Sequence, residues 1–442
     1  MAQQAQVRTL TLAAAIDRAE TNYPRTRVAL EQSNSAQARI GVARSAYYPR
    51  ADLLWQTNRA TANNIFGLLL PQGVIPSISG PVIASDNTRS AWSSAGGTLI
   101  AWQPFDFGLR AAQVNTATQG ALAAKAGFAL TKLDVAVLTA NVYFDLATAE
   151  QLATTARANV DRLQVFAKAV HILVDNQLRP GADAAQADAQ LALARTQLIQ
   201  AQTNVEVRRA TLGELVGTPA VEVDYAKLLV PAPPEQQGAA SIASHPAAQR
   251  EAALVNQQKA QLSALAHSYV PQFNALASLS GRGAGTDATG VFPGGSNGLA
   301  PNTMNWATGV QMTFPAFDFF RVRAEKKVQA ANVRAEQANY LQLVDDLSTG
   351  IQQAQAQLAG ARQAALNTPI ELSAAQQSEQ QQRARFQAGL ATVIDVAAAE
   401  SVLVQAEADN ALACLNVWRA MAAVSAARGD LNPFLSQVAA QP

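Results

Sequence analysis

The stretch QPFDFGLR spans residues 103–110, and the stretch FPAFDFFRVR spans residues 314–323. Both contain the tripeptide FDF, centred on Asp106 in the first and on Asp318 in the second, and a proline stands just before each copy. The two aspartates lie 212 positions apart (318 minus 106). The return of one unusual motif together with its proline indicates an internal duplication, in which each half needs the same local structure once.

The duplication extends to both sides of the motif. Downstream, the same offset of 212 brings Asp183 onto Asp395 without a gap (395 minus 183). Upstream, the offset becomes 222 (271 minus 49), which brings Pro49 onto Pro271. We therefore predict a first repeat at 1–217, a linker at 218–244, a second repeat at 245–430 and a C-terminal tail at 431–442.

Each repeat has the same order of elements along the chain. Period-two alternation predicts β-hairpins at about 50–103 and 271–314, although the strand at 52–63 alternates poorly and is placed mainly by the repeat. Segments rich in Gly, Pro, Ser and Asn at 64–88 and 281–302 are the expected hairpin loops. Helical patterns predict long helical hairpins at about 106–217 and 318–429. The first helix of each hairpin, expected at about 106–175 and 318–387, is about 70 residues long, or roughly 105 Å, and no compact domain needs such a rod. The predicted fold class is mainly α, with duplicated long helices and a pair of transmembrane β-hairpins.

Two segments alternate in the way expected of membrane strands. From Met304 to Phe314 apolar residues alternate with polar or small ones, and Trp92 and Trp102 share one face of another segment. Ten residues of strand span about 33 Å, close to the thickness of a bilayer once the strand is tilted. Aromatic side chains at both ends of an outward strand face form the girdle of a transmembrane barrel. The predicted girdle residues are Trp92, Trp102, Trp306 and Phe314.

Four strands cannot close a barrel, since transmembrane barrels begin at about eight strands, and an open sheet edge is not tolerated in lipid. Several chains must therefore contribute, and three would supply about twelve strands, which predicts a trimer. Each FDF motif then marks the point where a strand ends and a helix begins, because proline ends a strand ladder and aspartate caps a helix. The alternative is a cap and hydrophobic staple at the start of a soluble helix. The predicted strand–helix junction residues are Pro49, Pro104, Asp106, Pro271, Pro315 and Asp318.

The composition excludes several classes of function. Lys+Arg number 33 against 32 Asp+Glu, and this balance gives no electrostatic footprint for nucleic acid. The one cysteine, Cys414, and three scattered histidines give no metal-ligand spacing, and we expect no metal and no cofactor. No nucleophile–base–acid set is visible, so we do not expect an enzyme. The start MAQQAQ has neither the basic nor the apolar region of a signal peptide, which we expect to have been removed.

The chain resembles the TolC family of outer-membrane efflux proteins over about residues 8–430. The resemblance rests on the duplicated order of elements, the FDF pair, YYPRADL (47–53) and SYVPQFN (268–274). It also rests on LRPGADAAQADAQL (178–191) and GLATVIDVAAAES (389–401). It implies a homotrimer in the outer membrane of a Gram-negative bacterium, with a twelve-stranded barrel and a twelve-helix periplasmic tunnel. Such tunnels are passive conduits that dock onto a periplasmic adaptor protein and an inner-membrane transporter, in a tripartite efflux pump or a type I secretion system.

The resemblance also implies that the turns containing Gly181 and Gly389 form the periplasmic tips of the tunnel. Asp395 matches a family position whose ring of three carboxylates narrows the tunnel, and Ala398 stands where the family can carry a second Asp. Asp183 is the repeat equivalent of Asp395. The alternative for both aspartates is simple N-capping of the helix that follows each turn.

Opposite charges near the two turns suggest a polar latch that holds the tip closed. One of the arginines at 179, 383 and 385 would bridge to one of the aspartates at 175, 183 and 395. We favour Arg179, because Pro180 and Gly181 fix its turn; the alternative is a solvated charge. A competing function for the whole chain is a soluble coiled-coil adaptor or structural protein, but this does not explain the alternating strands. The exported substrate, whether drug, metal or protein, is not indicated.

Overall fold

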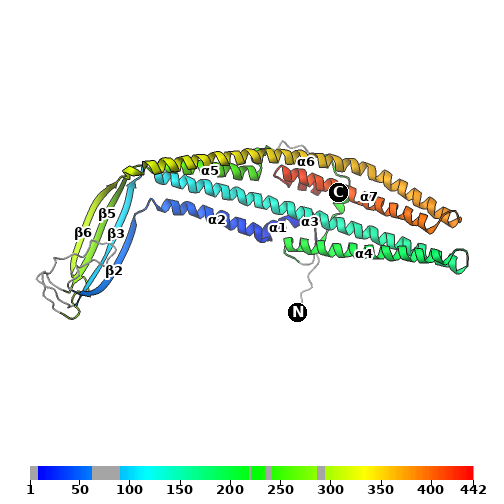
Figure 1. Ribbon diagram of the computed structural model, residues 1–442, viewed down its shortest axis with the longest axis horizontal. Helices are drawn as coiled ribbons and strands as arrows, with labels where there is room; N and C mark the ends of the chain where they lie inside the picture. The colour runs from blue at the N-terminus through cyan, green and yellow to red at the C-terminus, as the bar shows by residue number, and fades with distance from the viewer. Residues whose placement is uncertain (1–7, 62–89, 219–220, 235–240, 286–293, 442) are drawn as a thin grey trace. The chain divides into compact units, whose positions relative to one another are not determined.

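The structure is a computed structural model that describes residues 8–61, 90–218, 221–234, 241–285 and 294–441 (Figure 1). The chain forms two compact units, each built from pieces of both sequence repeats. The first unit contains residues 1–34, 122–253 and 337–442, and the second contains residues 35–121 and 254–336. The long helices α3 (Leu109–Asp175) and α6 (Phe319–Gln387) run through both.

The second unit contains a four-stranded antiparallel sheet with the order β2-β3-β5-β6 (Figure 1). Its strands are β2 (Arg50–Thr61), β3 (Ser90–Phe105), β5 (Gln272–Ala284) and β6 (Thr303–Thr313). The sequence predicted two β-hairpins, and the sheet consists of these two hairpins side by side. The whole of the first hairpin loop, expected at 64–88, lies outside the described residues. The second loop was expected from 281, but β5 continues to Ala284.

Close approach of the strands explains a glycine in the middle of the sheet. A Cβ atom at Gly97 would lie 2.5 Å from the carbonyl oxygen of Leu279 and 2.8 Å from the Cα atom of Ser280. Only glycine leaves room for β3 and β5 to pair there. The second unit is completed by parts of α2 (Pro24–Ser45) and α5 (Pro246–Ala266) and by the first turns of α3 and α6.

The first unit contains two antiparallel helical hairpins (Figure 1). In the first hairpin α3 is followed by α4 (Gly181–Val216), and in the second α6 is followed by α7 (Val393–Ala427). The sequence expected the long helices at about 106–175 and 318–387, and both end where expected. The helix α4 is capped at its C-terminus by Gly217, whose φ of 77° is a left-handed conformation that glycine adopts without strain.

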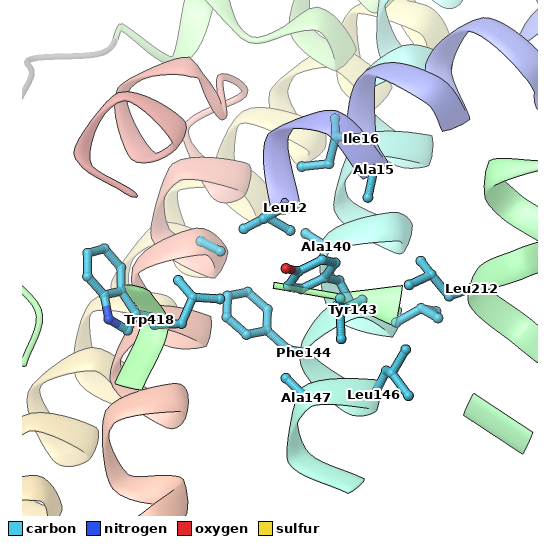
Figure 2. Packing of buried hydrophobic residues seen from close by; sticks show 14 of the residues in the cluster. Leu12, Ala15, Ile16, Ala140, Tyr143, Phe144, Leu146, Ala147, Leu212 and Trp418 are labelled. Atoms are coloured by element: carbon cyan, nitrogen blue, oxygen red, sulfur yellow. The ribbon is translucent and has the colours of Figure 1, made fainter. Parts of the chain in front are cut away.

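The main apolar core lies where α1 (Leu12–Asn22), α3, α4 and α7 meet, as Figure 2 shows. Tyr143 is fully buried there, and its hydroxyl lies 2.6 Å from the carbonyl oxygen of Asp224 and 3.0 Å from that of Leu10. These contacts hold the parallel pair of β1 (Arg8–Leu10) and β4 (Val221–Val223) against α3.

Segments expected to be a linker and a tail also contribute to this core. The segment at 218–244 includes β4 and the 3-10 turn η1 (Ala226–Leu229), whose Leu228 is buried. The tail includes α8 (Asn432–Ala439), whose buried Phe434 lies edge-on to Trp418 at 6.2 Å between ring centroids. These elements are too short for hydrophobic periodicity to predict them. Two further short turns are η2 (Ile242–Ser244) and η3 (Ala316–Asp318).

Among the described residues, none of the helices combines the length and the apolar character that a membrane span requires.

Candidate functional site

One face of the four-stranded sheet is covered with exposed apolar side chains. The pairing register aligns Leu53, Leu279 and Trp306 in one row across the sheet, with Thr98 between the first two. The large apolar residues of this face are between 42% and 83% exposed. They are Leu53, Trp55, Ile100, Trp102, Leu279, Met304, Trp306, Val310 and Met312. We call this surface the apolar sheet face. A large exposed apolar surface on a sheet marks contact with lipid or with another protein.

The opposite face of the sheet carries mostly polar and small side chains, with Leu54, Leu99 and Leu276 among them. On it Ser93 donates a hydrogen bond of 2.7 Å to Asn58, and the same face carries Asn274, Ser278 and Gln311. A sheet that is apolar on one side and polar on the other matches the wall of a barrel with lipid outside and water inside.

The predicted girdle residues lie on or next to the apolar sheet face. Trp92 and Trp102 stand at opposite ends of the paired part of β3, and the indole N–H of Trp102 donates to the carbonyl oxygen of Tyr47 at 3.0 Å. Trp306 lies level with Thr98, between those ends rather than at one of them. Phe314 follows β6 and packs against Tyr269, with the ring centroids 5.2 Å apart and the ring planes tilted by 54°. Sequence reasoning missed Leu53 and Trp55, because the alternation in β2 is weak.

The first FDF motif forms a buried junction. The carboxylate of Asp106 accepts hydrogen bonds from the backbone N–H of Arg110 at 2.6 Å and from its guanidinium at 2.8 Å. Arg110 also donates to the carbonyl oxygen of Ala46 at 3.0 Å, and both charged residues are buried. Burial alone would raise the pKa of Asp106, but the hydrogen bonds from Arg110 outweigh it and hold the pKa below its usual value. Asp106 therefore caps α3 as an ionised group.

The prolines of the junctions do not all stand at strand ends. Pro104 lies inside β3, which continues to Phe105 through a shift in register after Trp102. The expectation that this proline ends the strand is therefore wrong: the irregular pairing provides a position where its missing N–H costs no ladder hydrogen bond. Pro49 and Pro271 directly precede β2 and β5.

The second FDF motif is exposed and differs from the first. Asp318 ends the short turn η3, after Pro315, and its carboxylate binds the guanidinium of Arg321 at 2.7 Å. The Asp318 and Arg321 side chains are 43% and 59% exposed, whereas those of Asp106 and Arg110 are 11% and 6% exposed. The two copies of the motif share a sequence but not an environment.

At the other end of the helices, Arg179 connects the two helical hairpins. It lies in the turn between α3 and α4, and its guanidinium donates to the carbonyl oxygen of Phe386 at 2.8 Å and to that of Ala391 at 3.4 Å. It also lies over the Phe386 ring, 4.4 Å from the centroid. Since α6 ends at Gln387, the Phe386 carbonyl belongs to the last turn, where a cation satisfies free acceptors and interacts favourably with the helix dipole.

An apolar cluster surrounds this contact. Phe166 of α3 meets Phe386 of α6 edge-on at 5.3 Å between ring centroids, and Val170 is completely buried beside them. Val393 and Val396 of α7 complete the contact between the hairpins. The hairpins of one chain are thus joined by packing as well as by Arg179, so the expectation of a purely polar latch is corrected.

The two tip aspartates have local partners. The carboxylate of Asp395 accepts from the backbone N–H and the hydroxyl of Thr392, both at 2.8 Å, and Thr392 caps α7 in return. This backbone hydrogen bond lowers the pKa of Asp395, whose side chain is exposed. Asp183 lies 3.7 Å from Arg179 within the same hairpin. Arg179 meets backbone carbonyls and a ring on the second hairpin, rather than the carboxylate of Asp395.

The two tip glycines also differ. Gly389 has a φ of 76°, a conformation that favours glycine, and the turn before α7 depends on it. Gly181 is the first residue of α4 and needs no such freedom.

Comparison with known proteins identifies this architecture. The profile described as outer membrane efflux protein matches residues 15–218 and 239–430, most of the chain. The chain belongs to the outer membrane efflux protein family. Members of this TolC-type family are channels rather than enzymes, and this protein is a channel subunit of the Gram-negative outer membrane with a periplasmic helical tunnel. This assignment replaces the soluble adaptor as an interpretation of the chain.

Solved channels share the fold at low sequence identity. The outer membrane channel CmeC of Campylobacter jejuni is 15% identical with a TM-score of 0.78, over 95% of this chain and 85% of that one. VceC of Vibrio cholerae is 18% identical with a TM-score of 0.75, over 95% and 96% of the two chains. MtrE of Neisseria gonorrhoeae is 20% identical with a TM-score of 0.72, over 95% and 89%. No curated protein matches the sequence of this channel subunit.

Sequence reasoning missed two further ties between the hairpins of this channel subunit. Asp145 of α3 binds Arg419 of α7 at 2.7 Å. Arg162 of α3 binds Glu400 of α7 at 2.5 Å and Glu407 at 2.8 Å. The partners lie more than 200 positions apart in sequence, so no local pattern could have paired them.

Proposed function

We propose that three copies of this chain form the exit duct of a tripartite efflux pump or a type I secretion system. The two repeats, residues 1–217 and 245–430, would each supply one β-hairpin to a twelve-stranded barrel and one helical hairpin to a twelve-helix tunnel. The tunnel would dock at its periplasmic tip onto an adaptor protein and, with it, an inner-membrane transporter. Passage would be passive and controlled at that tip.

The observation that carries this proposal is the apolar sheet face together with the edges of the sheet. An exposed apolar face favours contact with outer-membrane lipid. The sheet has β2 and β6 at its edges, and an edge cannot stay open in lipid because its N–H and C=O groups would lack partners. Pairing β6 of one copy with β2 of the next satisfies both edges and closes the ring.

The mass of the protein in detergent and its conductance in a planar bilayer test the proposal. We expect a trimeric mass and discrete channel events. Val310 lies on the apolar sheet face at 76% exposure, and the adjacent Gln311 lies on the polar face. Val310→Lys should lower the stability of the membrane-inserted protein, by less than the roughly 2–4 kcal/mol of a midplane lysine because Val310 lies level with Trp102, and the matched variant Gln311→Lys should lower it much less still. A monomer with an intact β-sheet spectrum, or equal effects of the two lysines, would contradict the barrel.

A further inference from the structure

A cavity of about 190 Å³ lies between the two helical hairpins of the first unit. It is bounded by α3 and α4 of the first hairpin and by α7 of the second. Part of its lining is aliphatic, from Leu163, Leu193 and Val404, and part is amide, including Gln190 and Gln405. The volume equals that of about six water molecules at roughly 30 Å³ each.

Two buried oxygen atoms of the lining residues have no hydrogen-bond partner. Asn159 is 7% exposed and Glu400 is 3% exposed, and both line the cavity. The Oδ1 atom of Asn159 has no hydrogen-bond partner in the structure, and the Oε2 atom of Glu400 has only the guanidinium of Arg383 nearby, 3.8 Å away and beyond hydrogen-bond distance. Leaving such atoms without a hydrogen bond is unfavourable, and more so for a charged group. Both are acceptors, so the missing partner is a hydrogen-bond donor.

The ion-pair network around Glu400 carries more negative than positive groups. Arg162 of α3 holds Glu400 and Glu407 of α7. Arg383 of α6 lies 3.8 Å from Glu400 and 2.7 Å from Glu379. When all five are ionised, three glutamates face two arginines and one negative charge remains. A positively charged donor would satisfy both the free oxygens and this charge.

We propose that the cavity binds a short aliphatic amine as its ammonium ion. The ammonium group would donate to Glu400 and Asn159, and its alkyl chain would lie against Leu163, Leu193 and Val404. Six non-hydrogen atoms, as in n-pentylamine, fit the volume. A metal ion fits less well, since the described part of the chain contains no group of three or more His, Cys, Asp or Glu side chains that could hold one.

A bound amine would also tie the two hairpins together, because Asn159 belongs to the first hairpin and Glu400 to the second. Opening of the tip would then require the ligand to leave, so the amine should reduce conductance. This consequence rests on the proposed channel function, whereas binding itself does not.

Isothermal titration of the detergent-solubilised protein with n-pentylamine tests the site. We expect saturable binding at pH 7.5, and at least tenfold weaker binding of n-pentanol, which has the same length but no charge. Glu400→Gln and Asn159→Leu should each raise the dissociation constant at least tenfold. The matched variant Asn204→Leu, on an exposed position of α4, should not change it.

The idea is overturned if n-pentylamine does not bind, if n-pentanol binds equally well, or if neither cavity variant weakens binding. Asn159→Leu keeps Arg162 and its glutamates intact, so it remains informative if Glu400→Gln fails to fold. Conductance of the amine-free protein reports on the channel separately. A protein that conducts but does not bind n-pentylamine would therefore contradict the amine site without contradicting the proposed function.

Discussion

At the residue scale, Asp395 supplies both a negative charge and the hydrogen bonds of a helix cap, and two substitutions distinguish these two roles. Asp395→Asn keeps an oxygen that can accept from Thr392 but removes the charge, whereas Asp395→Ala removes both. If three copies narrow the tunnel, both variants should weaken cation preference in bilayer recordings. Only Asp395→Ala should loosen the first turn of α7, measured by hydrogen exchange. Unchanged selectivity in both variants would leave Asp395 as a cap alone.

The cation preference should also persist in mild acid. The pKa of Asp395 is lowered by its hydrogen bond to Thr392, so the group stays ionised until the pH falls through that lowered value. Selectivity measured between pH 8 and pH 5 should therefore be constant. A decline within that window would point to another titrating group.

His171 should make the stability of the first hairpin fall as the pH rises. Its ring lies 3.0 Å from Asp188 on α4, and this hydrogen bond, helped by the charge of Asp175, raises its pKa. A raised pKa means that the stabilisation is complete below the ordinary value of about 6.5 and is lost as the pH rises through the folded-state value. Hydrogen exchange of residues 165–190, corrected for intrinsic rates, should be faster at pH 8.5 than at pH 5.5. His171→Gln should abolish the difference, and a difference that survives it would exclude this pair as the cause.

Single residues were only partly predictable. The repeat register placed Arg179 in one turn and Asp395 beside the other, because proline, glycine and aspartate form recognisable turn patterns. It could not show that Arg179 binds the Phe386 carbonyl, which lies 207 positions away. Every residue has a backbone carbonyl, so the sequence does not indicate which one accepts a hydrogen bond. The charge pattern alone predicted a carboxylate as the partner of Arg179.

At the scale of elements, the two FDF junctions should respond differently to the same substitution. Asp106→Ala removes the cap of α3 and leaves Arg110 buried without its carboxylate, which should cost about 3–5 kcal/mol. Asp318→Ala breaks an exposed pair with Arg321 and should cost about 0–1 kcal/mol. Thermal unfolding followed by the helical circular dichroism band should separate the two variants clearly. Equal shifts would show that the buried environment of Asp106 does not matter.

Element positions followed the strength of the sequence pattern. The long helices α3 and α6 end at Asp175 and Gln387, as predicted, because tens of helical residues stop at an evident turn. The strand β2 was placed mainly through the repeat, and its exposed Trp55 was overlooked. The 3-residue strand β4 and the helix α8 were not predicted, since such short elements form through tertiary packing.

At the scale of the whole molecule, the two repeats have the same order of elements but different stabilising contacts. Polar contacts between the two helical hairpins, which we call ties, include the ion pairs of Asp145 with Arg419 and of Arg162 with Glu400 and Glu407, and the hydrogen bond from Arg179 to the end of α6. The tie at Arg179 lies in the turn that is expected to dilate. It is therefore the tie whose loss should most directly favour the open tip.

Arg179→Ser should raise single-channel conductance without any partner protein. The guanidinium makes two hydrogen bonds to carbonyl oxygens and covers the Phe386 ring, and its side chain is only 19% exposed. A hydrogen bond from a charged donor contributes roughly 1.5–3 kcal/mol, and three copies would act on one concerted opening. Because the partners are a ring and backbone carbonyls, high salt should reduce the difference between variant and wild type only slightly. Arg179→Lys, which keeps the charge but loses the planar contact, should be intermediate. Recordings of Arg179→Ser and wild type at low and high salt test this explanation. A conductance difference that disappears at high salt would indicate that Arg179 acts through an ion pair with Asp183. Equal conductance of the two proteins at low salt would show that the apolar cluster around Phe166 keeps the tip closed.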